Sequence, residues 1–307
     1  MDYRELLLLR ATRETGVLNA LVSNAHTAED VAEEAGITER AAEMTVDALL
    51  DMGLLEAVSE GVEPTNRMLG FITKTDVRSI GRLPHQLDYV DALVDLPETM
   101  ETGDVPESGP DWTRNRLGEQ AAEDDASVRA AVTAAVRERP DADDVLVVAG
   151  GAGQHAVEFA RRGFDVTLLD EPDVVDAVAP LLEHERVDLV AGDPLDGVDG
   201  DYDIVFHARV AREHDAEGNR RLLAAAEDAA AEDGLVMHVD VFATADGDGA
   251  ADAATTAELL ATTEDGACHA EGAVGEWFSE VGFADVRAGD VPGTPYRFVA
   301  GDRRAIQ

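Results

Sequence analysis

The stretch that decides the fold is VLVVAGGAGQHAVEFARRGFDVTLLDEP, residues 145–172. It reads as a buried strand, a glycine-rich turn, a helix and a second strand that ends at Asp170. Glycines in such a turn let backbone N–H groups at a helix N-terminus approach a ligand closely. An acid about twenty residues further on can accept hydrogen bonds from ribose hydroxyls. This half of a βαβ unit therefore predicts a site for a ribose-containing cofactor.

Strands and helices alternate from residue 145 to the end of the chain. We expect strands at 145–149, 165–170, 187–191, 202–207, 234–240, 285–289 and 296–300, and helices at 153–162, 173–183, 217–231, about 255–262 and 271–281. Such alternation predicts a parallel sheet with helices on both faces. Only GDVPGTP, residues 289–295, separates the last two strands, which is too short for a crossover helix, so they should pair antiparallel. The predicted class is α/β, a Rossmann-like doubly wound sheet with a late antiparallel strand.

The first part of the chain has the pattern of an α-rich winged helix. Apolar spacing predicts a helix over 3–22 with a break at Gly16, and then two short capped helices followed by a hairpin. The first of these helices should begin at Thr27 and end at Gly36, and the second should run from Thr38 to Met52. The inward face of the second helix should carry Ala41, Met44, Ala48 and Leu49. Strands are expected at 54–58 and near Val62. Connecting helices follow, including 128–136 with Ser127 as N-cap. We divide the chain into 1–76, 77–140 and 141–307.

The charge of the chain is extreme and evenly spread. It holds 65 acids against 24 lysines and arginines, a formal charge of −41, and Lys74 is the single lysine. Regular apolar periodicity argues against disorder, so we interpret the charge as that of a folded protein in a high-salt cytoplasm, such as that of a halophilic archaeon, where ions screen self-repulsion. The fold should then lose stability when salt is removed.

A winged helix usually binds DNA, but the charges here oppose that use. Residues 27–66 contain eleven acidic residues and one basic residue, Arg40. The phosphates of DNA would therefore be repelled by negative charge on this surface. We therefore expect no nucleic-acid partner, and we interpret this part as a packing or dimerisation module. The leucine-rich helix at 3–22 offers more apolar surface than so small a module can bury, which predicts a homodimer.

Other features bound the environment of the protein. Cys268 is the only cysteine, which rules out an internal disulfide. No apolar run reaches the eighteen or more residues of a membrane span, and LLLL at 6–9 lacks the basic start of a signal peptide. The eight histidines form no close pairs with metal-ligand spacing, so we expect no metal site. A soluble cytoplasmic protein without a membrane partner is expected.

Six segments in order resemble the class I S-adenosylmethionine-dependent methyltransferases, and the preceding winged helix narrows this to the small-molecule O-methyltransferase-like group. The segments are LVVAGGAG (146–153), TLLDEPDVV (167–175), VAGDPLD (190–196), YDIVFHARVAREHDAEGNRRLL (202–223), AEDGLVMHVD (231–240) and WFSEVGFADVRAGDVPGTP (277–295). The resemblance implies S-adenosylmethionine as cofactor and a small-molecule acceptor, with a hydroxyl oxygen as the site of methylation.

The resemblance also implies which residues hold the cofactor. Asp170 matches the acid that accepts from the ribose, and Asp193 matches the residue beside the adenine. Val147 stands where the family usually carries an acid, and Ala149 stands where a glycine is common; alanine is tolerable there if its φ is negative. The cofactor-binding set implied is Ala149, Gly150, Gly151, Gly153, Asp170, Glu171, Asp193 and Pro194.

The position of the general base is the main departure from the family. Many relatives place a histidine in the loop after the fourth strand, and here that position is Arg212. Arginine stays protonated, so it cannot take a proton, but it can favour an ionised acceptor. His214 and His207 lie nearby and are alternative bases. His85, Trp112 and His269 are further candidates for the substrate side.

Three other readings stay open at this point. A cofactor-binding protein without catalysis would explain Val147, Ala149 and Arg212. A DNA-binding regulator rests on the winged helix alone. A nicotinamide enzyme would need a glycine at 156, where the chain has Ala156.

Overall fold

The computed structural model describes residues 2–73, 77–243 and 253–304. The chain forms two compact units: residues 1–94 with 109–122, and residues 95–108 with 123–307. The three-part division at residues 76 and 140 stays a prediction, and its first boundary borders residues 74–76, outside the described ranges. Within those ranges, no helix is long and apolar enough to cross a bilayer.

The first unit begins with four helices and a hairpin in a winged-helix arrangement, and two further short helices follow them. Its elements are α1 (Tyr3–Glu14), α2 (Val17–Ser23), α3 (Ala28–Ala35), α4 (Glu39–Asp51), β1 (Leu55–Val58), β2 (Gly61–Pro64), α5 (Asn66–Thr73) and α6 (Val77–Ile80). The predicted break falls at Gly16, whose φ of 79° ends one helix and starts the next. Thr27 caps α3 in a reciprocal capping box with Asp30, as the sequence predicts.

The predicted inward face of α4 is correct at Leu49 and wrong at Met44. Met44 is 57% exposed, while α4 buries Ala42, Thr45, Val46 and Leu49. These four follow the i, i+3, i+4, i+7 spacing, so the inward stripe lies one or two residues from the predicted one. The acids Glu39, Glu43, Asp47 and Asp51 lie on the exposed face of α4. A phosphate backbone would meet negative charge there.

The helices that follow are α7 (Leu83–Thr102), α8 (Trp112–Ala121) and α9 (Asp125–Glu138). Asp124, not Ser127, caps α9: its carboxylate accepts from the Ser127 N–H across 3.0 Å. The predicted cap was placed too late because α9 begins three residues earlier than its apolar pattern.

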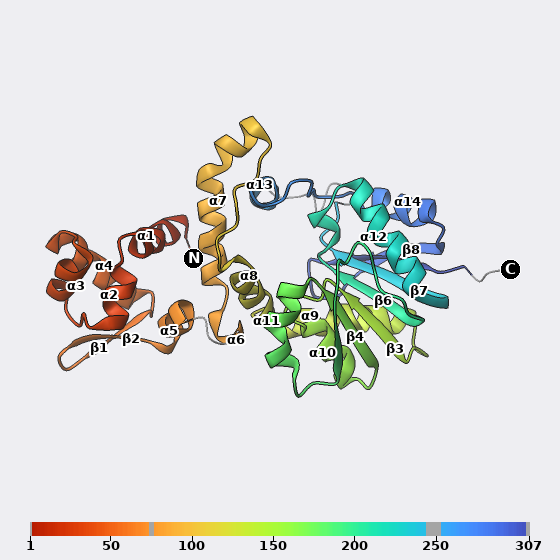
Figure 1. Ribbon diagram of the computed structural model, residues 1–307, viewed down its shortest axis with the longest axis horizontal. Coiled ribbons are helices and arrows are strands. Elements are labelled where there is room, and N and C mark those ends of the chain that lie inside the picture. Colours follow the sequence, from red (N-terminus) through yellow and green to blue (C-terminus); the bar gives the residue numbers. More distant parts are fainter. Residues whose placement is uncertain (1, 74–76, 244–252, 305–307) are drawn as a thin grey trace. The chain divides into compact units, whose positions relative to one another are not determined.

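The second unit contains a seven-stranded sheet between two helical layers (Figure 1). Its strands are β3 (Asp144–Val148), β4 (Asp165–Asp170), β5 (Val187–Ala191), β6 (Tyr202–Ala208), β7 (Ala230–Asp240), β8 (Ala284–Asp290) and β9 (Arg297–Asp302). Its further helices are α10 (Gln154–Arg161), α11 (Pro172–Leu182), α12 (Ala216–Ala229), α13 (Ala253–Thr262) and α14 (Glu271–Val281). The spatial order is β5-β4-β3-β6-β7-β9-β8.

The sheet is parallel apart from β9, which runs antiparallel to both β7 and β8. This confirms the prediction of a late antiparallel strand. The pairing of Asp240 with Arg297 brings the start of β9 to the carboxyl end of β7. Residues that follow β3, β4, β5, β6 and β7 therefore share one edge of the sheet with the segment before β9, and this edge is called the carboxyl edge below.

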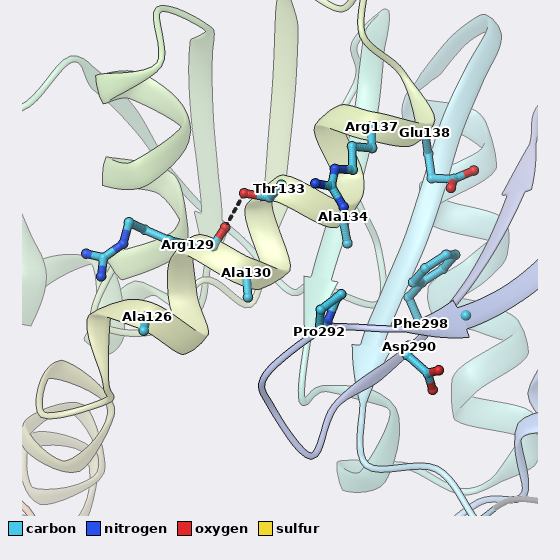
Figure 2. A pocket seen from close by; sticks show the side chains of 11 residues that line it. Ala126, Arg129, Ala130, Thr133, Ala134, Arg137, Glu138, Asp290, Pro292 and Phe298 are labelled. Carbon is cyan, nitrogen blue, oxygen red and sulfur yellow. Dashed lines mark hydrogen bonds between the residues drawn. The ribbon is translucent and has the colours of Figure 1, made fainter.

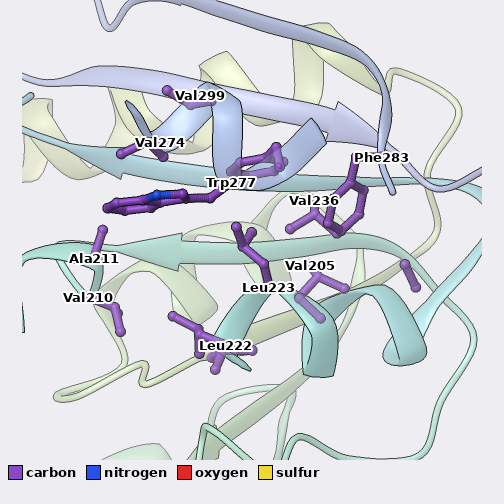
Figure 3. Packing of buried hydrophobic residues seen from close by; sticks show 14 of the residues in the cluster. Val205, Val210, Ala211, Leu222, Leu223, Val236, Val274, Trp277, Phe283 and Val299 are labelled. Atoms are coloured by element: carbon purple, nitrogen blue, oxygen red, sulfur yellow. The ribbon is translucent and has the colours of Figure 1, made fainter. Parts of the chain in front are cut away.

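Helices cover both faces of the sheet. Figure 3 shows Leu222 and Leu223 of α12 with Trp277 of α14 against Val205 and Val236 of the sheet. On the other face, α9 and α10 contact the sheet, and the rings of Phe159 and Phe206 meet at 5.4 Å. Burial of apolar side chains on both faces explains why the central strands are continuous apolar runs.

Candidate active site

The glycine-rich turn lies at the carboxyl end of β3. Ala149, Gly151 and Gly153 all have positive φ, at 49°, 54° and 83°. The condition under which alanine was expected to be tolerable, a negative φ, is therefore not met at Ala149. Its N–H donates to the Leu169 carbonyl across 2.8 Å, which fixes the strained residue between β3 and β4.

Two glycines of the turn are required by the protein itself. A Cβ on Gly150 would come within 2.7 Å of Leu168 Cγ, and one on Gly153 would come within 2.9 Å of Leu182 Cδ1. Gly153 also forms the N-cap of α10 and supplies no side chain to bond the first N–H groups of that helix. The helix start consequently offers backbone donors to the space at the carboxyl edge.

Asp170 ties the end of β4 to this turn. Its side chain is 4% exposed, Oδ2 accepts from the Gly151 N–H across 2.8 Å and Oδ1 accepts from the Glu171 N–H across 2.8 Å. An ionised carboxylate has about four lone-pair sites, so the group can also accept from ligand hydroxyls. Glu171 is exposed at the N-cap of α11.

The segment after β5 approaches the same residue. The Gly192 N–H donates to the Asp170 carbonyl across 3.0 Å. Asp193 is exposed and its Oδ1 accepts from the Leu195 N–H across 2.8 Å, while Pro194 is buried. The structure thus brings the predicted cofactor residues of three strand ends together at the carboxyl edge.

Arg212 and Asp240 form an ion pair at the ends of β6 and β7. Arg212 Nε donates to Asp240 Oδ1 across 2.8 Å, and a second guanidinium nitrogen contacts the same oxygen. Burial alone would lower the pKa of the Arg212 guanidinium, but Asp240 outweighs it and the pKa is raised. Arg212 is therefore a fixed, permanent positive charge.

Asp240 has an oxygen with no donor. Its Oδ1 also accepts from the Val241 N–H across 2.7 Å, whereas Oδ2 is buried without a hydrogen-bond partner among the described residues. A buried oxygen of this kind costs free energy unless a ligand or water donates to it.

A second ion pair lies beside the first. Arg209 has a φ of 62°, and one of its terminal nitrogens lies 3.4 Å from Glu123 Oε2. The Tyr296 hydroxyl donates to Glu123 Oε1 across 3.0 Å. Burial raises the pKa of the Tyr296 phenol, and Glu123 adds to the rise while Arg209 and Arg212 oppose it. The phenol therefore stays a donor at ordinary pH.

His207, one of the three predicted catalytic residues, lies in the core. It is 1% exposed, and its ring centroid is 4.3 Å from that of His238 on the neighbouring strand. Burial lowers the pKa of His207 to about 3 and that of His238 well below its usual value. Both rings are neutral at ordinary pH.

His214 lies two residues beyond Arg212, in the loop before α12. Its carbonyl accepts from Asn219 Nδ2 across 3.0 Å and lies 2.8 Å from His269 Nε2. His269 in turn stacks edge-on against Trp277. Asn219 and His269 therefore fix the loop through backbone contacts, and His214 keeps a half-buried side chain near Arg212.

His85 and Trp112 belong to the first unit. The His85 ring is 1% exposed and lies 4.8 Å from the Trp112 ring and 4.5 Å from the Tyr89 ring. Asp88 lies 3.6 Å from His85 Nδ1. This aromatic cluster is part of the packing of that unit.

A hollow of about 480 Å³ lies away from these residues. Figure 2 shows Ala130 and Ala134 of α9 on the side toward Pro292, which follows β8, and Phe298, near the start of β9. None of the predicted site residues lines it. The part of the chain that the structure describes contains no cluster of three or more metal-ligating side chains.

Comparison with known proteins identifies the family. The sequence-family model of the O-methyltransferase domain matches residues 122–284 of this chain. The chain belongs to the O-methyltransferase family. Its members use S-adenosylmethionine to methylate oxygen atoms of small molecules.

Individual relatives of this O-methyltransferase are distant. The 3-hydroxy-5-methyl-1-naphthoate 3-O-methyltransferase of Streptomyces sahachiroi is 24% identical over 91% of this chain and 86% of that protein. Among solved structures, PigF with S-adenosylhomocysteine has a TM-score of 0.72 at 17% identity, covering 98% of this chain and 96% of that one. Human N-acetylserotonin methyltransferase with S-adenosylmethionine has a TM-score of 0.68 at 18% identity, covering 98% and 94%. These structures share the fold.

The residues at the carboxyl edge fit the cofactor of this O-methyltransferase family. Asp170 presents a buried carboxylate beside a glycine-rich turn, and Gly153 at the N-cap of α10 has no side chain that could occupy the helix start. Among the described residues, the edge also contains buried carboxylate oxygens without hydrogen-bond donors. S-adenosylmethionine, with hydroxyls on its ribose and an ammonium on its amino-acid end, supplies such donors.

Sequence reasoning missed four residues of this edge: Asp240, Arg209, Glu123 and Tyr296. Asp240 ends a predicted strand and Arg209 lies three residues before Arg212, so the positions of both in the sequence could have indicated that they lie at this edge. Glu123 and Tyr296 are 173 residues apart, and only the fold brings them together.

Proposed function

We propose that this O-methyltransferase methylates an acidic hydroxyl of the phenol type, and that Arg212 stabilises the ionised oxygen in place of a base. The observation that carries the proposal is the Arg212–Asp240 pair, which holds a permanent cation at the carboxyl edge. A fixed cation lowers the free energy of a nearby oxyanion without any proton transfer to the protein. An acceptor with a phenolic pKa can then release its proton to solvent.

The cofactor supplies an activated methyl group on its sulfonium when it is bound. Asp170 is assigned to the ribose hydroxyls because its carboxylate is buried and anchored at both oxygens. Ala149, Gly150, Gly151 and Gly153 leave the backbone of the turn open to the cofactor, and Glu171, Asp193 and Pro194 flank the place assigned to the adenine. These residues orient the donor, and orientation of the two reactants accounts for much of the rate of such a transfer.

Neither histidine of the predicted catalytic set takes a proton in this proposal. His207 is enclosed with a pKa of about 3. His214 is kept as the alternative base because it lies in the same loop as Arg212. An aromatic acceptor is supported by the relative that acts on a hydroxynaphthoate.

A second candidate is a protein that binds the cofactor without turnover. Val147 in place of an acid, the strained Ala149 and Arg212 in place of a histidine favour it. Both candidates predict cofactor binding, so only an acceptor assay separates them.

We also propose that the protein is a homodimer formed through α1. Tyr3 and Leu7 on this helix are 70% and 46% exposed, while Leu9 is buried. Leu7→Glu should convert the dimer to a monomer in light scattering, because a charge in an apolar interface lacks a partner. Met44→Glu is the matched control, since Met44 is an exposed apolar residue on α4. A dimer that survives Leu7→Glu would refute this interface.

The test of the proposed function is a methyl-transfer screen in molar KCl with radiolabelled S-adenosylmethionine. Phenols, naphthols and catechols should accept the methyl group, and aliphatic alcohols, whose hydroxyls do not ionise, should not. Turnover of aliphatic alcohols at the same rate would contradict the proposal. Binding of S-adenosylhomocysteine without turnover of any acceptor would favour the second candidate.

A further inference from the structure

The amino-acid end of the cofactor carries both an ammonium and a carboxylate. The family resemblance implies an acid on the first strand of the sheet, which contacts this end or ordered water, and this chain lacks that acid. Val147 occupies the position on β3, and it is 1% exposed in an apolar setting. The positive charge of the ammonium therefore needs another partner, because a charge removed from water without a counter-charge is strongly unfavourable.

Glu123 is a carboxylate at the right edge of the sheet. Its side chain is 8% exposed, and Oε1 accepts from the Tyr296 hydroxyl. Oε2 receives no hydrogen bond from any described residue, although Arg209 lies 3.4 Å away. The contact with Arg209 is thus a charge contact without hydrogen-bond geometry, and it leaves Oε2 able to accept from a ligand.

Arg209 is the first residue after β6, the neighbour of β3 in the sheet. Its N–H donates to the Val239 carbonyl across 2.8 Å, which holds it in the left-handed region at a φ of 62°. Ala149, the first residue after β3, is also a non-glycine residue with positive φ. Two adjacent strand ends therefore carry backbone strain, which concentrates at ligand-binding sites.

The place of this pair within the site follows from its neighbours. Glu123 and Arg209 both act electrostatically on His155, a residue in the first turn of α10, directly after the glycine-rich turn. Arg212, which pairs with Asp240, acts electrostatically on Tyr296, as Glu123 and Arg209 do. The pair thus lies near both the glycine-rich turn and the residues assigned to the acceptor.

We propose that Glu123 and Arg209 together bind the zwitterionic amino-acid end of the cofactor, with Glu123 Oε2 accepting from the ammonium and the Arg209 guanidinium donating to the carboxylate. The proposal rests on the cofactor site assigned above. A zwitterion matches an existing ion pair because each charge gains a partner and the net charge of the site stays zero. Glu123 then supplies the negative charge that Val147 cannot.

The experiment is calorimetry of the full chain in molar KCl with three ligands. S-adenosylhomocysteine carries both charges, decarboxylated S-adenosylhomocysteine carries the ammonium alone, and 5′-methylthioadenosine carries neither. Glu123→Gln should lower the affinity for the first two ligands by about ten- to a hundredfold, as expected for loss of a charged hydrogen bond. Its affinity for the third ligand should be unchanged. Arg209→Gln should weaken only S-adenosylhomocysteine.

Glu138→Gln is the matched control, because Glu138 is another partly buried carboxylate paired with an arginine, Arg287, at 2.6 Å. It should bind all three ligands as the wild type does. Unchanged affinity of Glu123→Gln for S-adenosylhomocysteine would overturn the proposal. Equal losses for S-adenosylhomocysteine and 5′-methylthioadenosine would overturn it too, since they would mark a general structural defect. A wild-type protein that binds none of the three would overturn the cofactor site itself.

Discussion

Arg212 donates through Nε to Oδ1 of Asp240 across 2.8 Å, and this contact joins the loop after β6 to the end of β7. The carboxylate keeps the guanidinium charged and in place, at the position where the family resemblance implies a histidine. Chemistry at this position must therefore use charge and orientation, because the side chain has no proton-accepting atom.

Substitutions of Arg212 should separate charge from shape. Arg212→Lys keeps the charge but loses the planar fork, so we expect partial activity. Arg212→Ala should lower kcat by about 10²–10³, as for other preorganised groups that stabilise a developing oxyanion. His214→Ala should retain nearly the wild-type rate. Initial rates of methyl transfer measure all three, and a larger loss in His214→Ala than in Arg212→Ala would reverse the assignment.

Asp170→Asn should weaken cofactor binding while keeping an acceptor for the turn. The amide retains an acceptor for only one of the two backbone N–H donors, so circular dichroism should first establish that the variant folds, and the charge toward the ribose hydroxyls is lost. We expect a loss of about 1–3 kcal/mol in the binding of S-adenosylhomocysteine by calorimetry. Asp176→Asn, on the exposed side of α11, serves as the control. Wild-type affinity in Asp170→Asn would show that the ribose is held elsewhere.

Ala149→Gly should stabilise the protein. An alanine in the left-handed region destabilises the folded state by about 1–2 kcal/mol, and glycine removes this strain. Glycine also gives the unfolded chain more conformational freedom, which offsets about 0.4–1 kcal/mol of the gain. A net gain of about 0.5–1 kcal/mol in the free energy of unfolding is expected from urea titration. Ala152→Gly, in the same turn without a positive φ, should destabilise. Equal losses in both variants would show that Ala149 is not strained.

Stability should fall as the pH drops below neutrality. Burial lowers the pKa of His155 to about 4 and of His207 to about 3, and His238 lies well below its usual value. The folded state keeps these rings neutral, while the unfolded chain takes up protons below a pKa of about 6.5. The stabilisation is therefore complete above pH 6.5 and declines as pH falls toward the folded pKa values.

Urea titrations between pH 7 and pH 5 measure this decline, in a window above the usual pKa range of carboxyl groups. Each ring contributes up to about 1.4 kcal/mol per pH unit once the unfolded state is protonated. His238→Leu should reduce the slope of the free energy of unfolding against pH by the contribution of one histidine. A flat free energy of unfolding across this window would contradict the neutral state of the buried rings.

Local patterns predicted most of the fold. The glycine-rich turn, the strand ends at Asp170 and Asp240, and the Gly/Pro turn before β9 depend on neighbouring residues, so their signals lie in short segments. Met44 was misplaced because several apolar registers fit α4, and tertiary packing selected one. The contact between Glu123 and Tyr296 could not be predicted from short segments. It depends on how the fold brings together the residues just before α9 and just before β9. The salt requirement inferred from the charge of the chain stays a prediction.

The pH dependence of kcat/KM for two phenols of different acidity tests the central claim most directly. If Arg212 stabilises an acceptor that ionises by itself, the inflection should move with the pKa of the phenol and persist in His214→Ala. A single inflection near pH 6.5, shared by both phenols and removed in His214→Ala, would contradict the account, because it would identify a histidine as the base.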